Sequence, residues 1–168
     1  MRVRGKDAGS TNSSAIGATE DAASRRSARS DGPCFIVVGA LLKAGDELTP
    51  LAKEPVTRLQ LVRYAGASGD FNPIHWDPER AEEMGLGGVI AHGMLSMGFL
   101  GQYVAGVAGP ERVRRLQVRF GAMVRPGDEL TCRGTVRSAD GGRATLDVWV
   151  ENQEGEKVTT GEAEVEIG

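Results

Sequence analysis

The sequence predicts an α+β domain in which one long helix packs against an antiparallel β-sheet. Two observations carry this prediction. The middle of the chain contains helix start signals and a glycine-rich stretch without charge over residues 86–110, whereas residues 113–167 alternate apolar and polar side chains between short polar turns. Helices followed by a run of strands are typical of the α+β class.

The first part of the chain has a different composition. Residues 1–33 hold six basic and four acidic residues, few large apolar side chains and no periodicity. Such a segment buries too little apolar surface to offset the entropy lost on ordering. It also contains no apolar core of a secretory signal. We therefore expect a disordered tail over 1–33 and one folded domain over 34–168, in the cytoplasm.

Composition limits the possible partners. The formal net charge is -3 and the pI is about 5.5, which gives no electrostatic reason to expect nucleic acid. The charge-free stretch 86–110 is long enough to raise the question of a membrane span, but its many glycines, His92 and Gln102 favour a helix buried on all sides within the domain. We expect no nucleic acid and no membrane.

The chain has two cysteines, Cys34 and Cys132, which lie far apart and outside any metal-ligand spacing. Two buried thiols in a reducing compartment are the preferred interpretation, and a single disulfide is the alternative.

The folded part begins with strand-like residues and a helix. Residues 35–42 are apolar and β-branched, and residues 43–48 are typical of a turn into a short strand. Thr57 can cap a helix that extends to about residue 67. We expect its buried face to carry Leu59, Val62 and Ala65 or Gly66.

Two further helices follow. Asp77 as the N-cap and Pro78 at the first helical position indicate a short helix that ends at Gly85. The long helix should run from about Gly93 to Val107, and its small residues allow another backbone to approach closely.

The last third predicts strands joined by tight turns. Residues 113–120 are strand-like, and residues 130–137 alternate strictly. Asp140, Gly141 and Gly142 predict a hairpin turn into residues 144–150. A second turn over 152–156 leads to a last strand over 158–167, with Ala163, Val165 and Ile167 on one face.

A polar segment between the helices contains both histidines of the protein. Asp70 and His75 are five residues apart, and Pro73 between them has no N–H and moves Asn72 out of the helical region. The segment is therefore an irregular loop, which can bring the two side chains together. An imidazole and a carboxylate that converge on one water are able to act as general acid and base, although a loop aspartate and a surface histidine are the more common use of this spacing.

The wider string is more specific. Residues 64–75 read YAGASGDFNPIH, Ala81 follows six residues after His75, and AHGM spans residues 91–94. This string closely resembles the signature of (R)-specific enoyl-CoA hydratases and MaoC-like dehydratases. Among the members of this family, the residues of the string are most similar to those of the catalytic subunit of two-chain (3R)-hydroxyacyl-ACP dehydratases. The resemblance covers residues 35–168 and implies the hot-dog fold, a long central helix wrapped by an antiparallel sheet.

The resemblance also implies an activity and a set of site residues. Asp70 and His75 would hold and activate the water that adds across the double bond of a trans-2-enoyl thioester, giving a (3R)-3-hydroxyacyl thioester of CoA or of acyl carrier protein. Asn72 would support the loop or the Asp70–His75 pair by hydrogen bonding. The N–H of Gly93 would bind the thioester oxygen, because a helix start has unpaired N–H groups and only glycine lets the thioester approach.

Other residues have two interpretations each. His92 is either a buried histidine beside the helix start, which we prefer, or a direct participant in catalysis, and it is also a candidate for substrate binding. Trp76 and Met94 either line the acyl channel or serve as a surface aromatic and a core residue. A basic run over residues 112–125 either meets the phosphates of the carrier or forms a solvated strand face.

Two other functions stay open, a hot-dog thioesterase and a non-catalytic subunit of a hydratase heterodimer. A thioesterase of this fold would normally use a carboxylate on or before the central helix, and the Asp-x-Asn-Pro-x-His loop is not its usual site. A non-catalytic subunit would be expected to lack Asp70 or His75, and both are present. We expect a homodimer or a heterodimer with a second hot-dog chain, because a single sheet leaves an open edge. No metal site and no cofactor are expected, since no cluster has metal-ligand spacing and no dinucleotide-binding turn is present.

Overall fold

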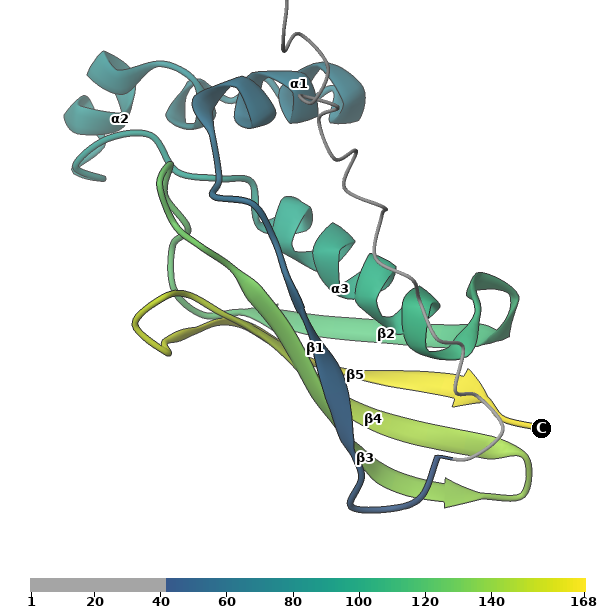
Figure 1. The fold of residues 1–168 in the computed structure, drawn as a ribbon. Coiled ribbons are helices and arrows are strands. Elements are labelled where there is room, and N and C mark those ends of the chain that lie inside the picture. The colour runs from purple at the N-terminus through teal and green to yellow at the C-terminus, as the bar shows by residue number, and fades with distance from the viewer. Residues whose placement is uncertain (1–41) are drawn as a thin grey trace, which may run out of the picture. The chain divides into compact units, whose positions relative to one another are not determined.

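A computed structural model describes residues 42–168 of the chain. The expected tail over 1–33, Cys34 and nearly all of the strand expected at 35–42 lie outside the described residues. The elements in chain order are β1 (Glu47–Ala52), α1 (Arg58–Ser68), the 3-10 turn η1 (Pro73–His75), α2 (Pro78–Glu83), α3 (Gly93–Ala108), the 3-10 turn η2 (Pro110–Arg112), β2 (Val113–Phe120), β3 (Thr131–Asp140), β4 (Arg143–Glu151) and β5 (Lys157–Glu166) (Figure 1).

The sheet is antiparallel, with the strand order β1-β3-β4-β5-β2. The predicted turns join its three central strands. Gly141 and Gly142 both adopt positive φ, 57° and 78°, which the tight β3–β4 hairpin requires. Residues 152–156 close the β4–β5 hairpin through the side chain of Asn152, whose oxygen accepts from the N–H groups of Glu154 and Glu156.

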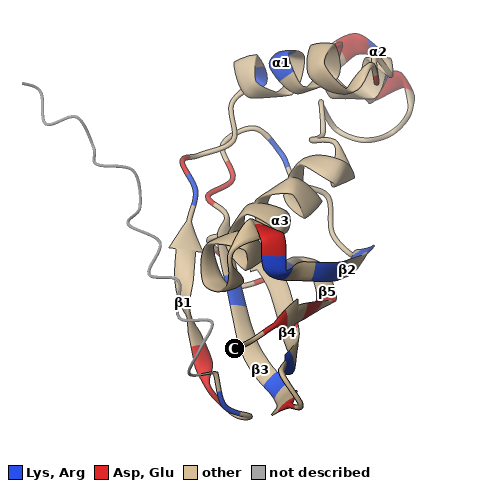
Figure 2. Cartoon of the chain, turned by 90° about the vertical axis from the view of Figure 1, so that its right-hand side faces the viewer, with Lys and Arg blue, Asp and Glu red and all other residues tan. Residues whose placement is uncertain are grey.

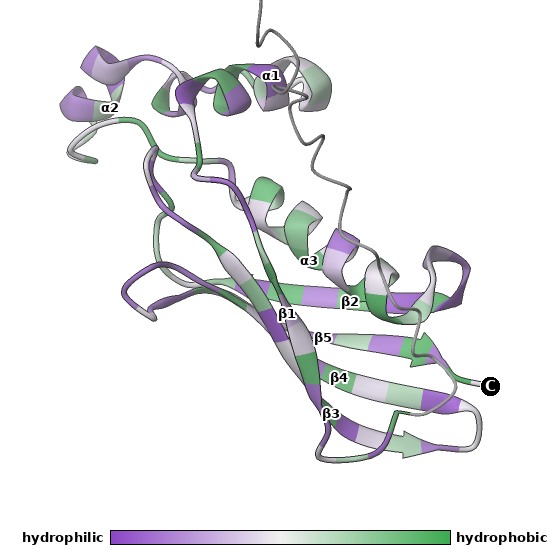
Figure 3. Cartoon of the chain, viewed as in Figure 1, coloured by the Kyte–Doolittle hydropathy of each residue, from purple (hydrophilic) through white to green (hydrophobic). Residues whose placement is uncertain are grey.

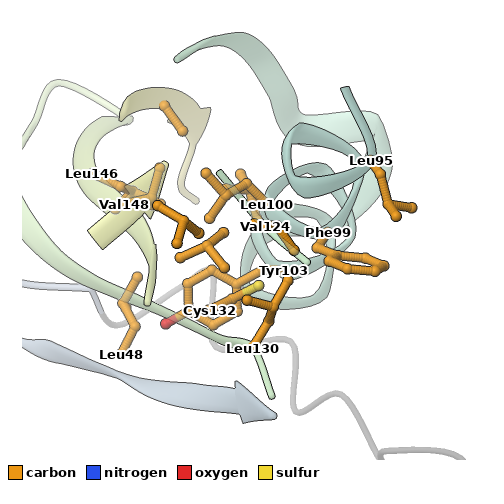
Figure 4. Close-up of a cluster of buried hydrophobic side chains, with 14 of the residues drawn as sticks. Leu48, Leu95, Phe99, Leu100, Tyr103, Val124, Leu130, Cys132, Leu146 and Val148 are labelled. Carbon is orange, nitrogen blue, oxygen red and sulfur yellow. The ribbon is translucent and has the colours of Figure 1, made fainter. Parts of the chain in front are cut away.

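Helix α3 packs against one face of this sheet and contacts β2, β3, β4 and β5 (Figure 1). The alternation expected from the sequence is confirmed, because Ala144, Leu146, Val148 and Val150 of β4 all point into the core. Figure 4 shows Leu100 and Tyr103 of α3 beside Leu146 and Val148 of β4 and Cys132 of β3. One long helix against an antiparallel sheet agrees with the predicted α+β, hot-dog arrangement.

The opposite face of the sheet is charged. Arg137 of β3 pairs with Asp147 of β4 and Glu162 of β5, and Arg133 pairs with Glu151 at 2.5 Å. Figure 2 shows these charges on the strands, whereas α3 carries none, and Figure 3 shows the same contrast as hydropathy. The sheet is therefore buried on one face only.

The basic run is partly neutralised within the sheet. On β2, Arg114 pairs with Glu166 at 2.5 Å and Arg115 with Glu164 at 3.2 Å, both acceptors being on the neighbouring strand β5. This pairing favours the interpretation of a solvated strand face for these two arginines.

Helix α1 begins as predicted, but only Ala65 of its predicted buried face is buried. The hydroxyl of Thr57 accepts from the N–H of Gln60 at 3.1 Å, and the helix then buries Leu61 and Ala65, which lie one turn apart. Leu59 and Val62 remain 58% and 54% exposed. The stripe of Leu61 and Ala65 and that of Leu59 and Val62 are both apolar in sequence. Which of them is buried therefore depends on the side of the helix that packs against the rest of the domain.

Helix α3 also differs from the expectation. It spans Gly93–Ala108 as predicted, but it is not buried on all sides, because Met94, Gly98 and Gln102 form an exposed stripe at a spacing of four residues. Because Gly98 has no side chain, the sequence pattern alone does not reveal this stripe. Among residues 42–168, no helix has the length and apolar character that crossing a membrane requires.

Candidate active site

A loop of two successive side-chain turns follows helix α1. Gly69 ends the helix with φ 74°, and its N–H donates to the carbonyl of Ala65 at 2.9 Å. The carboxylate of Asp70 then accepts from the N–H of Asn72 at 3.2 Å, and the side-chain oxygen of Asn72 accepts from the N–H of Ile74 at 3.3 Å. These bonds fold the chain sharply enough to return His75 toward Asp70.

Asn72 and Pro73 together start the short turn η1, which carries His75. Asn72 is its N-cap and Pro73 occupies the first position, where a missing N–H has no cost. The structure therefore places Asn72 where the sequence predicted it, as a support of the loop, and gives its role as a backbone cap.

Asp70 and His75 face each other across the loop. The distance from Nε2 of His75 to Oδ2 of Asp70 is 3.9 Å, which is too long for a hydrogen bond. His75 is buried at 8% exposure, whereas the Asp70 side chain is 53% exposed. The pair thus joins a buried imidazole to a carboxylate that is open to a substrate.

The tautomer of His75 follows from its partner. Its Nδ1 lies 2.8 Å from the carbonyl oxygen of Ile90. A carbonyl only accepts hydrogen bonds, so Nδ1 carries the proton and Nε2 presents a lone pair toward Asp70. Ile90 is itself held by its N–H, which donates to the carbonyl of Ile74 at 3.1 Å.

The second histidine completes the cluster. His92 is 3% exposed, and its ring stacks on that of His75 with centroids 3.7 Å apart and an interplanar angle of 23°. Its Nε2 donates to the main-chain oxygen of Asp70 at 3.0 Å. The preferred interpretation of a buried histidine beside the helix start agrees with this position.

Folding brings together a set of groups that sequence spacing did not reveal. One potential metal-ligand atom from each of Asp70, His75 and His92 lies within 4.8 Å of the others. These three groups have no metal-ligand spacing along the sequence, and folding alone brings them together. Because Nε2 of His92 carries the proton shared with Asp70, only its Nδ1 could bind a metal. The absence of a metal in the working protein stays a prediction.

Gly93 is the first residue of helix α3, directly after His92. Within residues 42–168, the N–H groups of Gly93 and Met94 have no hydrogen-bond acceptor, and the side chain of His92 does not cap the helix. Free N–H groups and the positive end of the helix dipole suit a developing negative charge. Gly93 is exposed, so a substrate can reach this helix start.

Several exposed apolar side chains belong to the segments around the site. Trp76 is half exposed and its indole N–H donates to the carbonyl of Phe71 at 3.0 Å, while Met94 is half exposed on the first turn of α3. Phe120, at the end of β2, packs against Gly93. Sequence reasoning gave no role to either phenylalanine. Phe71 occupies the variable position between Asp70 and Asn72 in the 64–75 string, and Phe120 arrives through the strand order alone.

Comparison with known proteins gives one family. The family model described as the MaoC like domain matches residues 42–158. In sequence, the fatty acid synthase subunit beta of Schizosaccharomyces pombe is 40% identical over 109 residues, which are 61% of this chain and 5% of that protein. This chain therefore spans only about a twentieth of that relative.

The matches to solved structures with similar folds cover a larger share of both chains than the match to the fatty acid synthase subunit. The (R)-hydratase from A. caviae involved in PHA biosynthesis has a TM-score of 0.67 and 29% identity, over 76% of this chain and 98% of that one. A MaoC-like dehydratase has a TM-score of 0.71 and 35% identity, over 76% of this chain and 41% of that one.

Proposed function

The chain belongs to the family of the MaoC like domain, and on this premise we propose that it is a hydro-lyase that interconverts trans-2-enoyl thioesters and (3R)-3-hydroxyacyl thioesters. The observation that carries the proposal is the Asp70–His75 pair, in which a buried imidazole directs the lone pair of Nε2 toward an exposed carboxylate 3.9 Å away. The (R)-hydratase from A. caviae, which is 29% identical in sequence, supports this activity.

The pair has the groups that hydration needs. A water between Nε2 of His75 and the carboxylate of Asp70 loses one proton to the pair as its oxygen bonds to C3 of the enoyl group. The pair then returns one proton to C2, so that water has added across the double bond and both side chains regain their starting state. Dehydration follows the same steps in reverse.

Negative charge collects on the thioester oxygen while C3 is attacked. The N–H of Gly93 at the start of α3 is free among the described residues and is the donor that we assign to this oxygen. A preorganised donor of this kind is worth about 10²–10³-fold in rate in enzymes where one has been removed.

The carrier and the acyl group belong to the proposal as well. We propose an acyl-CoA or acyl-carrier-protein thioester as substrate and assign Trp76 and Met94 to its binding, since both are exposed and near Asp70 or Gly93 in the chain. The relative from Schizosaccharomyces pombe is a fatty acid synthase subunit, which supports fatty acyl chains. The buried thiol of Cys132 supports a reducing compartment, the cytoplasm.

We also propose that the working unit contains two hot-dog chains, identical or different. Within residues 42–168, strands β1 and β2 each have one neighbour in the sheet, and the exposed stripe of α3 and the exposed Leu59 and Val62 of α1 are not covered by other described residues. Open strand edges and apolar patches of this kind favour association.

The activity test separates the candidate functions. With crotonyl-CoA as substrate, loss of enoyl-thioester absorbance without release of free thiol supports the hydro-lyase, whereas release of thiol would identify a thioesterase. Asp70→Asn and His75→Ala should each lower turnover by at least about 10²-fold while the fold survives. Asp140→Asn, in the exposed β3–β4 turn, is the matched control and should leave turnover unchanged. Near-normal activity in a folded Asp70→Asn or His75→Ala variant would refute the assignment.

A further inference from the structure

The imidazole of His92 contacts both Asp70 and His75 but takes no part in the proton transfers of the proposed hydration. It donates to the main-chain oxygen of Asp70 at 3.0 Å and stacks on His75 at 3.7 Å. It also contacts the ring of Tyr64, with centroids 4.9 Å apart and the two planes tilted by 53°. Three elements of the site, the Asp70 loop, His75 and the start of α3, therefore meet at one side chain.

The hydrogen bonds assign opposite tautomers to the two stacked rings. His75 carries its proton on Nδ1, because that atom faces the carbonyl of Ile90, and His92 carries its proton on Nε2, because that atom faces the carbonyl of Asp70. Nδ1 of His92 is buried without a hydrogen-bond partner among the described residues. A buried ring with one nitrogen unpartnered is held in place by its other nitrogen, so the bond to Asp70 fixes its orientation.

His92 also stands at the position where a helix usually receives a capping side chain. It is the N-cap of α3, yet its side chain makes no cap and leaves the first N–H groups of the helix free. A common N-cap such as serine or aspartate would bond those N–H groups itself. The side chain of His92 points instead to the loop that carries Asp70.

We infer that His92 is a positioning residue that sets the separation of the Asp70 carboxylate from Nε2 of His75 and the placement of both relative to the N–H of Gly93. This inference rests on the proposed function, because the three groups it places are those of the proposed reaction. An error of about 1 Å in such a placement can lower a rate by about 10²-fold.

The rival role is plain packing, since an aromatic ring between Tyr64 and His75 fills space whether or not it donates a hydrogen bond. Two substitutions separate the roles. His92→Phe keeps a ring for both stacks and removes the donor. His92→Gln removes the ring and keeps an N–H donor at about the reach of Nε2. Leu146→Val, in the buried sheet core, serves as the control for destabilisation alone.

Kinetics on the full chain give the first readout. We expect His92→Phe to lower kcat by about 10–100-fold with KM changed less than about threefold, and His92→Gln to recover about tenfold of that loss. Leu146→Val should lower the melting temperature with kcat nearly unchanged. If His92→Phe keeps the kcat of Leu146→Val, the donor is unimportant and the inference is wrong.

Nitrogen NMR of the two imidazoles gives a readout that needs no activity. The chain has only two histidines, so His92→Phe assigns both sets of signals at once. We expect the Nδ1–H tautomer for His75 and the Nε2–H tautomer for His92 in the unaltered chain. An Nδ1–H tautomer at His92 would overturn the inference, because Nε2 could not then donate to Asp70. Absence of hydration by the unaltered chain would refute the proposed function, and the NMR result would still decide whether His92 holds the loop.

Discussion

The ring of Phe120 lies where a side chain on Gly93 would have to be placed. A Cβ atom added to Gly93 would meet Cγ, Cδ1 and Cδ2 of that ring at 3.2–3.3 Å, closer than ordinary van der Waals contact. The end of β2 and the start of α3 are therefore tightly apposed at the site. The sequence predicts glycine here because a substrate must approach closely. The structure adds a second reason, which is that the Phe120 ring leaves little room for a side chain.

Gly93→Ala should crowd the Phe120 ring and lower kcat/KM by about tenfold, because relieving this contact would shift the helix start that we propose binds the thioester oxygen. The fold should survive, since alanine is a better helix former than glycine. A double-mutant cycle with Phe120→Ala measures the coupling: the loss caused by Gly93→Ala should shrink in the Phe120→Ala background. An equal loss in both backgrounds would assign the glycine to substrate approach alone.

Asn72→Ala should lower kcat by about tenfold and the free energy of unfolding by about 1 kcal/mol, the usual cost of a lost N-cap. The side-chain oxygen of Asn72 accepts from the N–H of Ile74 and thereby begins the turn that carries His75. Asn72→Ser keeps a capping oxygen and is the matched control. Steady-state kinetics and urea unfolding give both quantities, and equal kinetics for the alanine and serine variants would show that the cap does not position His75.

Burial raises the pKa of the Cys132 thiol to about 12, against a smaller lowering by Lys53. The thiolate is the reactive form, so Cys132 should resist thiol reagents at pH 8 in the folded protein and react fully on unfolding. Because the pKa is higher in the folded than in the unfolded chain, the thiol contributes stability below its ordinary pKa. That contribution is lost as the pH rises from the ordinary thiol pKa toward about 12. Labelling kinetics in a Cys34→Ser chain test this, and rapid labelling of the native protein would contradict the burial.

The purified chain, of 17.8 kDa, should have at least twice that mass in light scattering, because residues 42–168 leave sheet edges and the exposed stripe of α3 uncovered. Crotonyl-CoA hydration should accompany the dimer peak. Activity that requires co-expression of a second hot-dog chain would select a heterodimer. A stable and active monomer would refute the two-chain unit.

Local signals in the sequence predicted most of the elements. Thr57 and Asp77 identify helix starts because a cap acts within three residues, and the alternation around Leu146 identifies a strand because side chains alternate across a sheet. The sequence did not predict which stripe of α1 is buried, the bond from His92 to Asp70, or the ring of Phe120 on Gly93. Each of these depends on segments that meet only after the sheet has formed.

The strand order has a consequence for how the domain acquires its structure and how it can change. Strands β3, β4 and β5 follow one another over residues 131–166 and are joined by tight turns, so this meander needs only short loop closures. Strand β1 pairs with β3 across more than eighty residues, as Leu48 does with Gly134. Asp70, His75, His92 and Gly93 all lie in that long excursion. The chain thus separates a locally connected meander from the segment that carries the proposed site, and substitutions in that segment can alter activity while the meander keeps its own contacts.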